Sequence, residues 1–171
     1  MRYSTALSGI AALTFGIAIS LPAQAVTKAR SVLSQGGTAC QLSVPTTDTK
    51  VRPKASGFRN EGTASAFVIC GYPTPDGKLT QFTMRFQSLD GAAHVVDCTG
   101  VNGPPNSAVY SAKSVTPDEE GNGGLIWTAA DFGGTAGENM PNNGYMSATC
   151  TLPGEVSITK VTVDYDEDVG S

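Results

Sequence analysis

The sequence contains few of the residue types that most often carry catalysis or hold transition metals. It has one histidine, His94, and one tryptophan, Trp127, and its four cysteines include no C-x-x-C pair. A structural zinc site usually needs closely spaced cysteine and histidine ligands, so we expect no such site. The G-x-S-x-G motif that marks the nucleophile of many α/β-hydrolases is also absent.

Charged residues make up only 15% of the chain, and they are unevenly distributed. Residues 26–90 contain eight Lys or Arg against four Asp or Glu, whereas residues 91–171 contain two against eleven. An acidic chain with scattered basic residues is not expected to bind nucleic acid. The contrast indicates two differently charged surfaces that aid solubility or pack on one another; a partner-binding or self-associating surface is the alternative.

The sequence has one long hydrophobic run, and it lies at the N-terminus. Arg2 gives a positive start, residues 6–21 are apolar, and residues 23–25 form an A-x-A cleavage site. The run is too short to span a membrane. We therefore expect residues 1–25 to be a signal peptide, cleaved after Ala25 to give a secreted or periplasmic protein without a membrane span.

Large aliphatic side chains are scarce beyond residue 25, where fourteen valines stand against six leucines. An excess of valine over leucine favours strands over helices. A chain with so thin a core is expected to depend on disulfides, which form in an oxidising compartment. Four cysteines allow three pairings; we favour Cys98–Cys150, because each of the two closes an apolar run of one parity, and this leaves Cys40–Cys70.

Short apolar segments separated by turn signals predict an all-β fold, an antiparallel sandwich of about eight strands of Ig-like or Greek-key type. We expect a loose N-terminal arm over 26–37, the sandwich over 38–165 and an acidic tail over 166–171. Residues 57–62 are predicted as a turn. The expected strands are 39–44, 64–70, 79–89, 94–98, 108–115, 125–132, 145–152 and 156–165.

The last two predicted strands have the clearest pattern. Residues 145–152 alternate between apolar and hydroxyl side chains, which is typical of a strand with one buried face. Residues 153–154 (Pro-Gly) predict a turn, so the strand 156–165 would return and close a hairpin. Its apolar residues change parity near Thr159 and Lys160, which predicts a one-residue bulge there.

No residue is predicted to be catalytic. A Ser-His-Asp arrangement using His94 and Asp97 would make the protein a small secreted hydrolase. The two side chains, however, have opposite parities in their predicted strand. The hydrolase is therefore only an alternative.

Calcium is the one cofactor that the sequence suggests. Residues 118–123 resemble the first half of an EF-hand loop, with Asp118, Glu120 and Asn122 as oxygen ligands, but Ala129 replaces the bidentate Glu of the twelfth position. The alternative is a solvated loop followed by a frayed acidic tail. The tail contributes three further candidate ligands of one parity: Asp164, Asp166 and Asp168.

These patterns favour a non-enzymatic binding or structural module for an unknown extracellular ligand or protein. Rigid cross-linked scaffolds with long polar loops are a usual setting for recognition. The candidate ligand contacts are Trp127, Tyr110 and Tyr145, with the loops 100–106, 117–124 and 133–144.

The cysteine framework is similar to that of two groups of proteins. The segments 39–40, 57–60, 66–70 and 145–153 resemble small secreted bacterial β-domain proteins without an assigned activity, which implies an exported β-domain and no particular chemistry. Cys40, Cys70 and Tyr165 more loosely resemble the early disulfide and the C-terminal strand of chaperone–usher pilins, which implies a subunit of a surface assembly. A second cysteine pair and six residues beyond Tyr165 depart from the pilin pattern.

Overall fold

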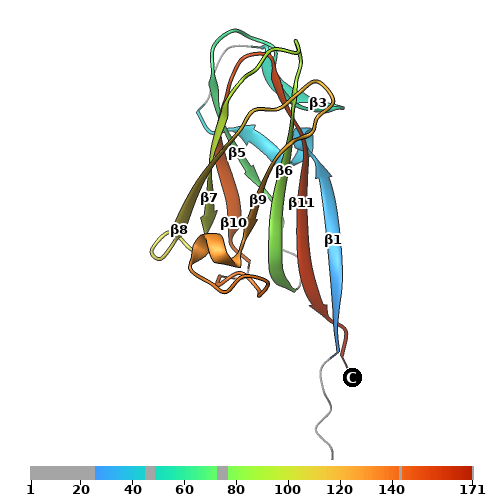
Figure 1. The fold of residues 1–171 in the computed structure, drawn as a ribbon, viewed down its shortest axis with the longest axis vertical. Helices are drawn as coiled ribbons and strands as arrows, with labels where there is room; N and C mark the ends of the chain where they lie inside the picture. Colours follow the sequence, from blue (N-terminus) through green and yellow to red (C-terminus); the bar gives the residue numbers. More distant parts are fainter. Residues whose placement is uncertain (1–25, 45–48, 73–76, 143, 171) are drawn as a thin grey trace, which may run out of the picture.

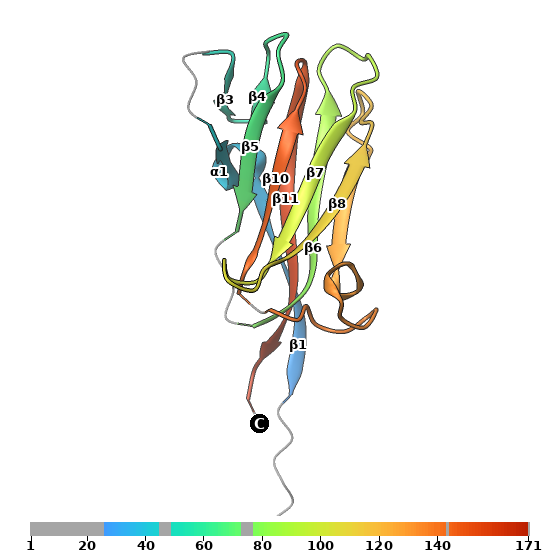
Figure 2. The same cartoon turned by 90° about the vertical axis from the view of Figure 1, so that its left-hand side faces the viewer.

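Two antiparallel β-sheets packed face to face form the molecule (Figure 1 and Figure 2). The computed structural model describes residues 26–44, 49–72, 77–142 and 144–170. The predicted signal peptide, residues 1–25, lies outside the described residues. The predicted antiparallel sandwich is confirmed.

One sheet has six strands and the other has five. The six-stranded sheet has the order β3-β4-β11-β6-β9, and β1 pairs with β11 beyond the end of β4. Its strands are β1 (Thr27–Gln35), β3 (Val51–Lys54), β4 (Gly57–Asn60), β6 (Lys78–Ser88), β9 (Gly123–Thr128) and β11 (Val156–Asp168). The five-stranded sheet has the order β2-β5-β10-β7-β8. Its strands are β2 (Cys40–Leu42), β5 (Ala66–Gly71), β7 (Val96–Asn102), β8 (Val109–Val115) and β10 (Met146–Leu152).

Alternating side chains from the two facing sheets make the core. In β6, Phe82, Met84 and Phe86 are fully buried, and in β10 the buried residues likewise occur at every second position. Two short helical turns, α1 (Gly36–Ala39) and the 3-10 turn η1 (Ala129–Phe132), complete the described structure. Period-two burial on both sheets explains why valine rather than leucine dominates the composition.

Both predicted disulfides are confirmed. Cys40 pairs with Cys70, and Cys98 pairs with Cys150. Each bond joins residues that lie directly opposite one another on neighbouring strands of the five-stranded sheet. All four cysteines are buried on the core face, so the disulfides add apolar volume as well as cross-links.

The predicted closing hairpin is wrong in its pairing. β10 and β11 are consecutive in the chain, but β10 lies at the centre of the five-stranded sheet and β11 at the centre of the other. Residues 153–155 therefore carry the chain from one sheet to the other. A short Pro-Gly turn also suits a crossing between packed sheets, so the turn signal alone does not identify the pairing partner.

The predicted bulge in the last strand is confirmed. The register between β11 and β6 shifts between Ile158 and Lys160. Ile158 and Val161 are both fully buried although their parities differ. One extra residue in β11 thus keeps the apolar residues on both sides of the bulge in the core.

The predicted arm and tail are paired strands, so both expectations need correction. β1 pairs antiparallel with β11 from Thr27 opposite Asp168 to Gln35 opposite Lys160. No β1 side chain is buried, which explains the missing apolar alternation in the sequence. Backbone hydrogen bonds and an Arg30–Glu167 ion pair of 2.8 Å hold this ribbon together. Figure 1 shows it extending beyond the end of the sandwich.

The segment 57–62, predicted as a turn, begins as strand β4. Phe58 enters the core, and Asn60 is fully buried. The Asn60 side chain donates to the carbonyl oxygens of Ala64 and Leu152 and accepts from the Gly62 N–H. Glycine and asparagine signal turns, but here asparagine links strand ends in the interior.

We expect Gly100→Ala to destabilise the fold by about 1–3 kcal/mol, the usual cost of overpacking. A Cβ at Gly100 would lie 2.6 Å from Trp127 Nε1, inside the core. Gly71→Ala is the matched control, because a Cβ there meets nothing within 4 Å. Urea unfolding of the two variants measures the difference; equal stabilities would contradict the described packing of Trp127.

Candidate functional site

A band of small hydroxyl side chains covers the outer face of the five-stranded sheet. In β10, Ser147, Thr149 and Thr151 alternate with buried residues and therefore point outward. Thr149 lies opposite Thr99 of β7. Thr151 lies opposite Asp97 of β7, which in turn lies opposite Ser114 of β8, so the band extends onto a third strand. We call this surface the hydroxyl face, defined by Thr99, Ser114, Ser147, Thr149 and Thr151.

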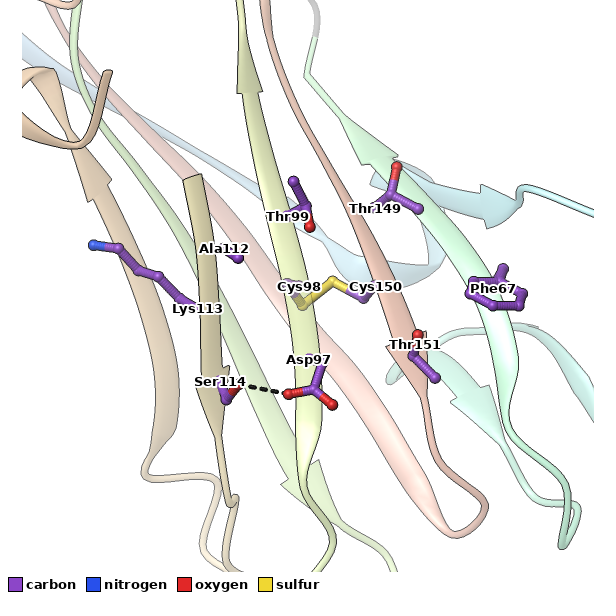
Figure 3. A pocket seen from close by; sticks show the side chains of 10 residues that line it. All are labelled: Phe67, Asp97, Cys98, Thr99, Ala112, Lys113, Ser114, Thr149, Cys150 and Thr151. Atoms are coloured by element: carbon purple, nitrogen blue, oxygen red, sulfur yellow. Dashed lines mark hydrogen bonds between the residues drawn. A yellow bond between two sulfur atoms is a disulfide. The ribbon is translucent and has the colours of Figure 1, made fainter. Parts of the chain in front are cut away.

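The Cys98–Cys150 disulfide fixes the spacing of the hydroxyl face. It joins β7 to β10 on the buried side, between the outward pairs Asp97 and Thr99 on β7 and Thr149 and Thr151 on β10 (Figure 3). A cross-link between neighbouring strands restricts their sliding. The backbone positions that carry the hydroxyl groups are therefore held in place before any ligand arrives.

Two aromatic side chains flank this face. Phe67 of β5 lies opposite Thr151 and is 56% exposed, and Tyr110 of β8 lies opposite Val101 and is 65% exposed. A groove of about 390 Å³ runs between Phe67 and β8 (Figure 3). A second hollow, of about 300 Å³, adjoins it over β2, β5 and β10. Sequence reasoning missed Phe67, although its parity is opposite to that of Val68 and Cys70.

One acidic side chain lies in the groove. The Asp97 carboxylate accepts a hydrogen bond of 2.5 Å from Ser114 Oγ, which fixes its position on the hydroxyl face. Lys113 also lines the groove, but its ammonium group points away to an ion pair of 2.7 Å with Asp131. Burial raises the pKa of Asp131, but Lys113 together with the N–H and hydroxyl of Thr128 outweighs burial, so the pKa of Asp131 is lowered. Asp97 is thus the one carboxylate that lines the groove.

The two predicted tyrosines lie at one end of this sheet. Tyr145 is 55% exposed and immediately precedes β10, and its carbonyl accepts hydrogen bonds from Gly103 N–H and from the Asn102 side chain. Asn102 also binds both the N–H and the carbonyl of Asn142. This buried asparagine therefore brings the loops after β7 and before β10 together. The loop 117–124 follows the other end of β8 and does not join them.

Trp127 is not a ligand contact, so that prediction is wrong. Its side chain is fully buried, and its Nε1–H donates to the Ser111 carbonyl at 3.0 Å. The ring also contacts Phe82, with centroids 5.9 Å apart. The single tryptophan fills the core between the sheets and satisfies its one donor there.

His94 and Asp97, the residues of the hydrolase alternative, have different partners. His94 Nε2 lies 2.8 Å from Asp90 Oδ1, and Asp97 binds Ser114. Asp90 also accepts a hydrogen bond from Ser88, so the carboxylate stands between the serine and the histidine. In a nucleophilic triad the histidine must stand between them to remove the serine proton. His94 does not do so here.

The predicted calcium ligands have protein partners. Asp118 accepts hydrogen bonds from the Asn122 N–H and then from its side-chain amide, and these lower the pKa of Asp118. Asp164 accepts from Gln81, and Asp166 lies opposite both Ala29 and Lys78. Within the described part of the chain, no three His, Cys, Asp or Glu side chains gather closely enough to hold a metal. Calcium binding stays a prediction.

Comparisons with known proteins give little more. No protein-family model and no curated protein matches the chain. The crystal structure of the Podospora anserina GH26-CBM35 β-(1,4)-mannanase is similar over 78% of this chain, with 14% identity and a TM-score of 0.36. The chain spans only 27% of that protein. The solution structure of CtCBM11 is similar over 89% of this chain and 90% of its own, with 11% identity and a TM-score of 0.32. Scores this low lend no support to a function.

The described residues give one coarse statement about location. They include two disulfides, which fit an oxidising compartment. Among the helices that the structure describes, none is long and apolar enough to cross a membrane.

We expect Asp90 to titrate with a pKa of about 2, below its ordinary value of 3.8, because the Ala92 N–H and then His94 stabilise its charged form. A lowered pKa means that this stabilisation is present above the unfolded value and is lost as the pH falls toward 2. Carboxyl-carbon NMR measures it. His94→Ala should raise the value without restoring 3.8, because the Ala92 N–H remains. An Asp90 pKa at its ordinary value would contradict this geometry.

If the 118–123 loop or the 164–168 segment binds calcium, millimolar Ca²⁺ should raise the melting temperature and a chelator should reverse the rise. Scanning calorimetry with Mg²⁺ as the control ion measures the shift. Asp118→Asn and Asp166→Asn assign it to one of the two segments. A melting temperature that Ca²⁺ leaves unchanged would refute the prediction.

Proposed function

We propose that the protein is an exported, non-catalytic binding module that recognises a neutral carbohydrate on its hydroxyl face. The observation that carries the proposal is the outer surface of the five-stranded sheet, where hydroxyl groups on three adjacent strands lie between two exposed aromatic rings. The predicted signal peptide and the two disulfides support export.

The polar groups suit a ligand that carries many hydroxyls. A threonine or serine hydroxyl both donates and accepts hydrogen bonds, so it can match a sugar hydroxyl in either direction. Thr99, Thr149 and Thr151 carry no charge to repel or select an ion. Asp97 adds one strong acceptor at a position fixed by Ser114.

The aromatic groups supply the apolar contact. Phe67 lies on β5 and Tyr110 on β8, with β10 and β7 between these two strands. Neighbouring strands are about 4.8 Å apart, so the two rings are separated by roughly 14 Å across the strands; Phe67 is level with Ser114 of β8, so Tyr110 is also offset by roughly 13 Å along them. Exposed rings at this separation fit an extended chain of several sugar units, with apolar sugar faces against the rings and hydroxyls over the threonines.

The first test is binding to neutral polysaccharides. Affinity electrophoresis against soluble β-glucan, mannan and xylan identifies a retarding polymer, and calorimetry with its oligosaccharides gives the affinity. We expect Phe67→Ala and Tyr110→Ala each to weaken binding about tenfold, which corresponds to ~1.4 kcal/mol. Ile126→Ala is the control, because Ile126 is 42% exposed on the outer face of the other sheet.

A second pair of variants separates carbohydrate recognition from hydrophobic adhesion. Thr99→Val and Thr149→Val keep the side-chain shape but remove the hydroxyl groups. They should weaken sugar binding if those groups bond the ligand. Retention by none of the polymers, or valine variants that bind as well as the parent protein, would reject the proposal.

A further inference from the structure

Two cations lie side by side on the outer face of the six-stranded sheet, on the other side of the molecule. Arg85 of β6 lies directly opposite Lys160 of β11, and both side chains are exposed. Like charges opposite one another on neighbouring strands are destabilising. Neither forms an ion pair with any residue that the structure describes, whereas Lys54, Lys113 and Arg30 all do.

Local backbone features hold this pair in place. The β11 bulge sets Lys160 outward and opposite Arg85, and the Thr159 hydroxyl donates to the Arg85 carbonyl at 3.2 Å. On the other side, Gly124 of β9 leaves room for the arginine: a Cβ there would lie 2.9 Å from the Arg85 side chain. Bulges frequently re-aim side chains near functional sites.

A cavity of about 350 Å³ adjoins the two cations. It receives Glu120 from the loop before β9, so two positive charges and one negative charge face the same space. The remaining lining groups are hydroxyl, amide and backbone groups that can bond a polar ligand. The lining consists of Arg85, Gln87, Glu120, Gly121, Thr159, Lys160 and Thr162.

We propose that this cavity binds a sugar acid, with the sugar carboxylate between Arg85 and Lys160. A guanidinium fork matches a planar carboxylate, and an ammonium adds a second positive charge. Glu120 repels a small dianion such as sulfate, but it accepts hydrogen bonds from the hydroxyls of a sugar ring. The cavity carries one net positive charge, which complements a monoanion. This site does not depend on the hydroxyl face, because it lies on the other sheet.

The test is an NMR titration of the ¹⁵N-labelled protein with the sodium salt of the methyl glycoside of galacturonic acid, whose carboxylate is free. We expect saturable shifts of the backbone amides of Gly121, Lys160 and Thr162, and none with the neutral methyl galactoside. Arg85→Gln and Lys160→Gln should each weaken binding roughly tenfold or more, because each removes a charge-assisted contact. Lys28→Gln is the matched control, since Lys28 is also exposed and forms no ion pair with a described residue.

Sodium sulfate and Glu120→Gln test the role of the carboxylate. The parent protein should bind sulfate more weakly than the sugar acid, and Glu120→Gln should narrow that difference. Sulfate binding as tight as that of galacturonate would show an inorganic anion site only and would overturn the proposal. Absence of saturable shifts, or full binding by the Arg85→Gln and Lys160→Gln double variant, would overturn it too. Variants at Phe67 and Tyr110 should leave this titration unchanged, so the two proposals can fail separately.

Discussion

The crossing between β10 and β11 positions most of the structure, because it places consecutive segments at the centres of two different sheets. Gly154 lies within this crossing, where a Cβ would come within 2.3 Å of the Gly62 carbonyl oxygen. Asn60 binds the Leu152 carbonyl just before the crossing and the Gly62 N–H beside it. The end of β4 and the end of β10 are thus fastened together. The remaining strands pair outward from the two central strands, β10 and β11. The alignment of one sheet on the other therefore depends on the close packing at the crossing between them.

Sequence reasoning identified the features that depend on local alternation. Large apolar residues at every second position mark β6 and β10, and the parity of Cys98 and Cys150 favoured the pairing that the structure confirms. The bulge near Thr159 follows in the same way, because two apolar runs of opposite parity must both face the core. Such patterns are visible because each strand has one buried face.

The features that the sequence did not predict depend on contacts between distant segments. β1 buries no side chain, so its pairing with β11 leaves no apolar pattern to detect. Trp127 was taken for a surface ring because nothing near it in the sequence shows that Gly100 leaves space for its indole. Phe67 alternates correctly as an outward residue, but only the strand order shows that it flanks the same threonines as β8. Strand order, and hence the make-up of a surface, is a long-range property.

The two outer faces of a sandwich point in opposite directions, and this geometry has a consequence for how such a molecule would act in a polymer network. Packed sheets are separated by about 10 Å, so ligands on the two faces would be held apart by the thickness of the core and could not compete for the same space. A module with one neutral-sugar face and one acidic-sugar face would be divalent and would tie two chemically different chains together. Its retention would then depend on simultaneous engagement of both chains more than on the affinity of either contact.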